Sequence, residues 1–185
     1  AVGSTDASAA LATGATGDIL VRAPWVSDGY DGLWATEREA RPGDGWHRSG
    51  DVGHVDTQGR LWVEGRAVHV IGTVDGPVTP VPVERAVERA LPGRRAAVVG
   101  VGPEGCQQVV VVVEIPDARH GGLAPDDVTA AVRDAASVPV AAVLATSALP
   151  VDIRHNAKID RIRVGGWAAQ LLAGGGTGGR LRRTP

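Results

Sequence analysis

The residue whose type is hardest to explain by solubility alone is Lys158, in the stretch "VDIRHNAKIDR". It is the only lysine among the 19 Lys and Arg residues of the chain. An ammonium is a compact charge with rotatable donors, whereas a guanidinium is a wide, planar fork. We therefore expect Lys158 to be needed for its shape and position in a crowded site, with His155 and Asn156 as neighbouring polar donors. Chance retention of one lysine is the alternative.

Two other charged residues have types and neighbours that suit a nucleotide. Asp51 lies between glycines in "RSGDVG", where a ligand can approach closely, and a carboxylate can accept the paired hydroxyls of a ribose. On the residues alone, an aspartate that organises a turn is the commoner case. Arg66 ends the stretch "LWVEGR" and could clamp a phosphate or a diol. A solvated surface arginine is the simpler interpretation of that residue.

Two other kinds of site, a dinucleotide-binding loop and a zinc site, are not supported by the sequence. Gly100, Gly102 and Gly105 have the G-x-G-x-x-G spacing of a dinucleotide loop, but Pro103 interrupts them and a valine run follows. Such a loop must open a helix, so we expect a tight turn between two strands instead. The five histidines and one cysteine show no zinc-ligand spacing, so the sequence predicts no protein metal site.

The segments that must position these residues alternate between strand and helix patterns. Residues 1–16 are expected to be a linker or a truncated connection, and residues 17–66 to form short strands, including a hairpin about the turn "DTQG". Residues 67–173 contain three helix patterns and three strand patterns, which predicts an α+β unit with a three-stranded sheet covered by helices. Residues 174–185 read as a flexible tail.

The composition limits the function classes. At 185 residues and a net charge of −2, the chain gives no electrostatic case for nucleic acid. Its apolar runs are far shorter than the ~20 residues of a membrane span. One cysteine cannot form an internal disulfide, and the first residues lack a secretion signal, so a cytoplasmic protein is expected. The absence of methionine suggests a fragment.

Five blocks, taken in order, resemble the C-terminal part of the adenylate-forming superfamily, which contains acyl-CoA synthetases, luciferases and adenylation domains. They are "GDILVRAPWVSDGY", "WHRSGDVGHVDTQGRLWVEGR", "GPVTPVPVERAVERAL", "AAVVGVG" and "LPVDIRHNAKIDR". The resemblance implies an α+β fold, in which residues 17–66 end a large AMP-binding domain and residues 67–173 form a small lid domain. Within this superfamily, the sequences of these blocks are most similar to those of the β-lactone synthetases of bacterial olefin biosynthesis.

The resemblance also implies a role for each candidate residue. Asp51 matches the aspartate that accepts the ATP ribose hydroxyls, and Arg66 matches an arginine that contacts ribose or phosphate. Lys158 matches the catalytic lysine that binds the carboxylate and the α-phosphate. Ala67 and Val68 match the hinge about which the small domain rotates. The implied cofactor is ATP with Mg²⁺, the metal being held mainly by ATP and by residues outside this chain.

Several residues differ from the usual family pattern, and these differences favour one of the family's reactions over the others. Ala157 replaces a common glycine, "DIRHN" replaces a Thr-rich lead-in, and Val68 stands where a charged hinge residue is usual. The segment "HVIGTVDGPVTP" replaces the Gly-rich loop that helps to seat coenzyme A. Together these changes imply an enzyme that adenylates a long-chain 2-alkyl-3-hydroxy acid and closes it to a β-lactone, releasing AMP and pyrophosphate. Other enzymes of olefin biosynthesis are possible partners.

Two alternatives remain open at the level of sequence. One is a fatty-acyl-CoA ligase or a carrier-loading adenylation enzyme, and the other is a non-catalytic fragment or interaction module. The family's phosphate-binding loop and its metal-binding glutamate are expected upstream of these blocks and do not occur in this sequence. We therefore expect the isolated chain to be inactive.

Overall fold

The computed structural model describes residues 10–26, 29, 32–118, 121–151, 158–175 and 181. The chain divides into two compact units, Ala1–Val68 and His69–Pro185. The expected hinge residues lie in a short 3₁₀ helix, Ala67–His69, where the side chain of Val68 is 81% exposed. No helix of the described part is long and apolar enough to cross a lipid bilayer.

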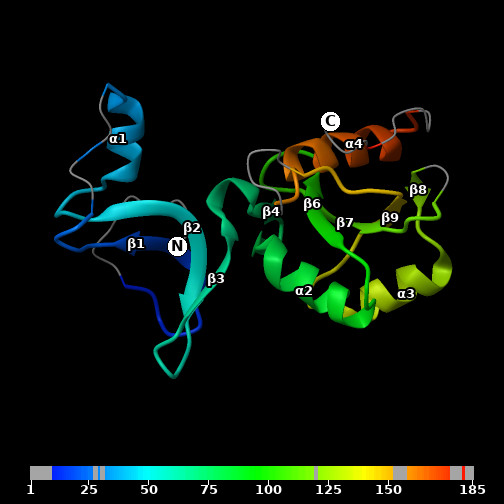
Figure 1. The fold of residues 1–185 in the computed structure, drawn as a ribbon, viewed down its shortest axis with the longest axis horizontal. Coiled ribbons are helices and arrows are strands. Elements are labelled where there is room, and N and C mark those ends of the chain that lie inside the picture. Colours follow the sequence, from blue (N-terminus) through cyan, green and yellow to red (C-terminus); the bar gives the residue numbers. More distant parts are fainter. Residues whose placement is uncertain are drawn as a thin grey trace. The chain divides into compact units, whose positions relative to one another are not determined.

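The first unit is a small antiparallel sheet with one short helix. Its strands are β1 (Gly17–Val21), β2 (His47–Val55) and β3 (Leu61–Arg66), in the order β1-β2-β3, and the helix α1 (Trp34–Ala40) lies between β1 and β2 in the sequence. The predicted hairpin about "DTQG" is confirmed, because β2 and β3 pair antiparallel across that turn (Figure 1).

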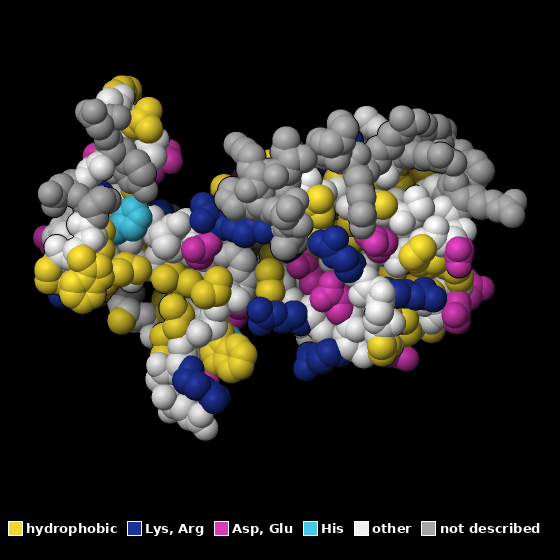
Figure 2. Space-filling view, in the orientation of Figure 1, with side chains coloured by type: hydrophobic (Ala, Val, Ile, Leu, Met, Phe, Trp, Pro, Cys, Tyr) yellow, Lys and Arg dark blue, Asp and Glu magenta, His cyan; other side chains and the backbone are white. Residues whose placement is uncertain are grey.

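The first unit has little hydrophobic core of its own. Among its described residues, only two hydrophobic side chains are buried, Ala40 and Val52. Large hydrophobic side chains gather on its surface instead, as Figure 2 shows, and they include Trp25 at 85% and Trp34 at 72% exposure. A surface of this kind is typical of a part that packs against further protein.

The second unit is the predicted α+β fold, with helices on both faces of one sheet. The sheet has the order β6-β7-β9-β8, with β7 and β9 parallel and the other neighbours antiparallel. Helices α2 and α3 cover one face and α4 covers the other (Figure 1). The elements are α2 (Pro80–Ala90), β6 (Ala96–Val101), β7 (Gln108–Glu114), β8 (Gly122–Leu123), α3 (Asp126–Ala135), β9 (Ala142–Thr146) and α4 (Arg161–Leu172).

The valine run of β7 is continuous because both faces of this strand are buried. Side chains of a strand alternate between faces. Val109, Val111 and Val113 pack in the core under α2 and α3, whereas Val110 and Val112 pack under α4. A central strand covered by helices on both sides needs no polar positions, and this accounts for the sequence pattern.

Two features of the second unit were not predicted. A short hairpin, β4 (Ile71–Thr73) with β5 (Gly76–Val78), precedes α2, and the two-residue strand β8 adds a fourth member to the expected three-stranded sheet. Both are too short to show a periodic hydrophobic pattern.

Candidate functional site

Asp51 and Arg66 lie opposite each other on β2 and β3. Their Cα atoms are partners in the antiparallel register, and Arg66 Nη1 donates to Asp51 Oδ1 at 3.3 Å. The side chains are 33% and 53% exposed, so both charged groups remain open to solvent. The ion pair between these two candidates was not predicted from the sequence, because their pairing depends on the strand register.

The local backbone explains how Asp51 is held. The Ser49 hydroxyl accepts a hydrogen bond from the Asp51 N–H at 3.1 Å and donates to the Ile19 carbonyl at 3.0 Å, which ties this point of β2 to β1. Gly50 has φ +76°, and a Cβ atom there would lie 3.0 Å from Arg66 Nη2. Glycine therefore suits this position for two reasons, its left-handed backbone and the room it leaves for the guanidinium.

This arrangement can bind a polyhydroxyl or anionic group. A partly exposed carboxylate can accept hydrogen bonds from two adjacent hydroxyls. Arg66 holds the carboxylate in place and has a fork of donors that suits a phosphate or a diol. These are the roles expected of both residues, and they remain predictions.

Lys158 lies in the second unit and is exposed. Residues 152–157, and with them His155, Asn156 and Ala157, are outside the described residues. Directly after the lysine, Ile159 forms an antiparallel bridge with Val151, and the Asp160 N–H donates to the Pro150 carbonyl at 2.9 Å. Asp160 also caps α4, its carboxylate accepting from the Arg163 N–H at 3.1 Å.

A largely buried ion pair that was not predicted from the sequence lies close to Lys158 along the chain. Arg161, the first residue of α4, donates from Nε to Glu84 Oε1 at 3.0 Å and from Nη2 to Glu84 Oε2 at 2.5 Å. Glu84, on α2, is 6% exposed and also accepts from the Val98 N–H at 3.0 Å. The two residues are 77 positions apart, so spacing along the sequence could not reveal the pair.

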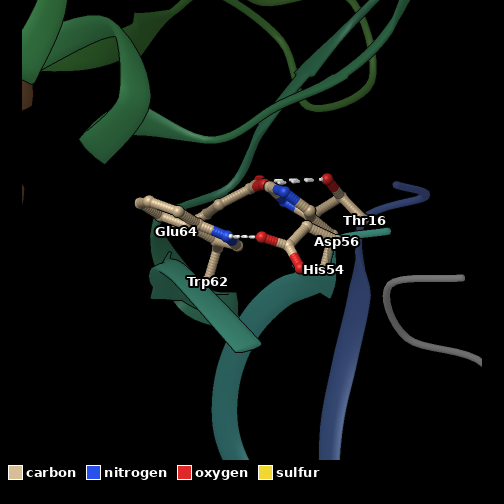
Figure 3. A network of polar contacts seen from close by, with 5 residues as sticks. All are labelled: Thr16, His54, Asp56, Trp62 and Glu64. Atoms are coloured by element: carbon tan, nitrogen blue, oxygen red, sulfur yellow. Dashed lines mark hydrogen bonds and ion pairs between the residues drawn. The ribbon is translucent and has the colours of Figure 1, made fainter. Parts of the chain in front are cut away.

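A second polar network, which was not predicted from the sequence either, stabilises the β2–β3 hairpin (Figure 3). Glu64 accepts from the Thr16 hydroxyl at 3.0 Å and pairs with His54 Nδ1, while the Trp62 indole N–H donates to Asp56 Oδ2 at 2.8 Å. Hydrogen bonds from Trp62 first, and then from Arg60 and Gln58, lower the pKa of Asp56 from 3.8 to about 2. All five residues of Figure 3 lie on β2, β3, their turn or the approach to β1, so the network holds this hairpin together.

The described residues contain no group of three or more His, Cys, Asp or Glu side chains that could hold a metal ion. The Mg²⁺ that the resemblance implies is expected to be held mainly by ATP and by residues outside this chain. Asp51 and Arg66 belong to the first unit and Lys158 to the second.

No protein-family model matches the chain. Among curated proteins, it is 40% identical over 172 residues to an olefin β-lactone synthetase of Xanthomonas campestris, which covers 86% of this chain and 31% of the relative. The corresponding protein of Stenotrophomonas maltophilia is 37% identical over 88% of this chain and 31% of its own length. An indoleacetate–CoA ligase of Aromatoleum aromaticum is 39% identical over 56% of this chain and 20% of its own length. The chain thus spans about a third of the length of the first two relatives.

Solved structures show the same fold. The amide bond synthetase McbA from Marinactinospora thermotolerans has a TM-score of 0.70 and 28% identity, over 86% of this chain and 32% of that chain. The ATP-bound MatB from Rhodopseudomonas palustris has a TM-score of 0.70 at 22% identity, over 86% of this chain and 31% of that one. At this low identity, the second likeness concerns the fold alone.

Proposed function

This chain matches the C-terminal part of the adenylate-forming superfamily, as its sequence indicated, and from that premise we propose that it forms the C-terminal third of an AMP-forming ligase. The ligase activates the carboxylate of a long-chain 2-alkyl-3-hydroxy acid with ATP and closes the product to a β-lactone. The observation that supports this most strongly is the 37–40% identity to olefin β-lactone synthetases over most of the chain. The proposal is also supported by the exposed Asp51–Arg66 pair, which suits ribose and phosphate binding, and by the single lysine, which supplies a compact cation for the adenylation step.

In this proposal, Asp51 and Arg66 bind the nucleotide. The Asp51 carboxylate accepts the two ribose hydroxyls, and Arg66, paired to it at 3.3 Å, holds its orientation and donates to ribose or phosphate. ATP bound with Mg²⁺ would bring a cation that neutralises part of the phosphate charge.

Lys158 acts in the chemical step. A carboxylate oxygen attacks the α-phosphorus, the bond to the pyrophosphate oxygen breaks, and an acyl-adenylate forms. Two anions must approach each other in this step, and an ammonium between them lowers the repulsion as charge moves in the transition state. Because Lys158 lies on a separate compact unit, movement of that unit can bring the ammonium in and exclude water from the mixed anhydride.

The second step needs no further substrate. The β-hydroxyl oxygen of the acyl group attacks the activated carbonyl carbon, the bond from that carbon to the phosphate oxygen of AMP breaks, and the hydroxyl proton leaves to solvent. Attack from within the same molecule gains from proximity. The products are a β-lactone and AMP.

The test uses a chimera in which this chain replaces the C-terminal third of the Xanthomonas campestris relative. The upstream part supplies the rest of the large domain, and the native relative is the positive control. We expect β-lactone and AMP from a 2-alkyl-3-hydroxy acid and ATP without coenzyme A. A chimera that folds and binds ATP but makes no lactone would contradict the proposed reaction.

A second candidate function is an acyl-CoA ligase, which the 39% identity to the indoleacetate–CoA ligase favours. The same chimera separates the two. An adenylate that persists without coenzyme A and turns into a thioester when coenzyme A is added would support the ligase. A chimera that forms no adenylate with either addition would favour the non-catalytic fragment.

A further inference from the structure

The chain on both sides of Lys158 is attached to the core of the second unit by carboxylates. Before the lysine, Glu114 Oε2 accepts from the N–H of Leu149, whose side chain is fully buried. After the lysine, Arg161 forms its two hydrogen bonds to Glu84. Both carboxylates belong to elements of the core, Glu114 to the end of β7 and Glu84 to α2.

The attachment at Glu84 is the stronger of the two. Glu84 accepts three hydrogen bonds, two from Arg161 and one from the Val98 N–H of β6, so it joins α2, β6 and the start of α4 at one point. A bidentate arginine–carboxylate pair fixes orientation as well as distance. The Arg161 side chain is 16% exposed and that of Glu84 is 8% exposed, so water competes little for either group.

Only two residues separate Lys158 from Arg161, and both are themselves held. Ile159 bridges to Val151, and Asp160 donates its N–H to Pro150 while its carboxylate caps α4. A short tether with these bonds leaves the backbone of Lys158 little freedom relative to α4. The direction in which the lysine leaves the core is therefore set at Arg161.

We propose that Glu84 is a positioning residue: through Arg161 it fixes the place at which Lys158 leaves the second unit. The inference rests on the proposed function for the catalytic use of this lysine, but the positioning itself can be measured without catalysis. Removing one partner of a buried pair leaves the other uncompensated, so the start of α4 shifts or loosens when the pair is broken.

The single lysine makes the test direct. The chain labelled with ¹⁵N-lysine gives one backbone amide signal, from Lys158. We expect the Glu84→Gln substitution to lower the heteronuclear NOE of this signal and to shift it, because the neutral amide cannot hold Arg161 in the same bidentate pair. Glu88→Gln is the matched control. Glu88 lies on the same helix and also accepts a backbone N–H of β6, from Ala96 at 3.1 Å.

Either of two results would overturn the proposal: an unchanged Lys158 signal in Glu84→Gln, or an equal change in Glu88→Gln. If Glu84→Gln does not give a folded chain, Arg161→Gln breaks the same pair from its more exposed side and is judged by the same signal. In the chimera, Glu84→Gln should lower the rate of adenylation on the order of tenfold to a hundredfold, with little effect on the KM for ATP. If Glu84→Gln changes the Lys158 signal while a Lys158→Ala chimera keeps full adenylation activity, the positioning stands and the catalytic role proposed for Lys158 is rejected.

Discussion

At the scale of single residues, Asp51 is held by its backbone while its carboxylate stays available. Its N–H is bound by Ser49, and its side chain touches Arg66 yet remains 33% exposed. A purely structural aspartate would use its carboxylate to close the turn, as Asp56 does with the N–H groups of Gln58 and Arg60. The contrast between these two aspartates of one hairpin favours a ligand-binding role for Asp51.

Replacing Asp51 tests that role. In the chimera, Asp51→Ala removes the proposed acceptor of the ribose hydroxyls and should cost about 1.5–3 kcal/mol, or about 10- to 150-fold, mainly in the KM for ATP. Steady-state kinetics at varied ATP would measure it. Asp75→Ala, at an exposed aspartate between β4 and β5, is the control and should leave the KM unchanged. An equal KM in both variants would exclude Asp51 from the nucleotide site.

Asp56 gives a prediction about pH. Its pKa is lowered to about 2, so its ionised form is favoured by folding. The stabilising effect is complete above the ordinary value of 3.8 and is lost as the pH falls through about 2. The Trp62 indole N–H donates to this carboxylate, so its NMR chemical shift should change as Asp56 is protonated, with a midpoint near pH 2. An Asp56→Asn chain should lose this titration, and a midpoint close to 4 in the unsubstituted chain would contradict the hydrogen-bonded turn.

At the scale of elements, the G-x-G-x-x-G spacing has a structural explanation. Gly100 lies in β6, and Gly102 and Gly105 lie in the turn to β7 with φ of +113° and +82°. The expected strand–turn–strand is confirmed, and no helix follows the glycines. Gly100 itself is needed because a Cβ atom there would lie 2.8 Å from Ile71 Cγ2 and 2.8 Å from the Gln107 side chain.

Gly100→Ala should therefore destabilise the second unit by about 1–3 kcal/mol, since the added methyl group has no room. Gly122→Ala is the matched control in a strand, because no atom lies within 4 Å of a Cβ built there. Urea denaturation of the chain, followed by circular dichroism, would compare them. Equal midpoints for the two variants would show that β4 and the β6–β7 turn do not pack as described.

The sequence predicted the elements that carry a clear hydrophobic period or an unbroken valine run, such as α2, α3 and β7. It did not predict β4, β5 or β8, which are two or three residues long and contain glycine or proline. For the candidate site, the types of Asp51, Arg66 and Lys158 were informative on their own. The Asp51–Arg66 and Glu84–Arg161 pairs were not, because each depends on which elements the fold brings together.

At the scale of the whole molecule, the two units differ in how complete they are. Of the 14 large hydrophobic residues that are exposed in the described part, 10 belong to the first unit. The second unit has a core on each face of its sheet. This difference fits the proposal that the first unit completes a larger adenylating domain, while the second is a separate moving part.

ATP–pyrophosphate exchange measures most directly whether Lys158 supplies the cation for adenylation. We predict exchange by the chimera and none by the isolated chain. Lys158→Ala should reduce the exchange about a hundredfold to a thousandfold, or roughly 3–4 kcal/mol, and Lys158→Arg should fail to restore it because the guanidinium is too wide. A chimera that exchanges equally well with alanine at position 158 would exclude Lys158 from the adenylation step.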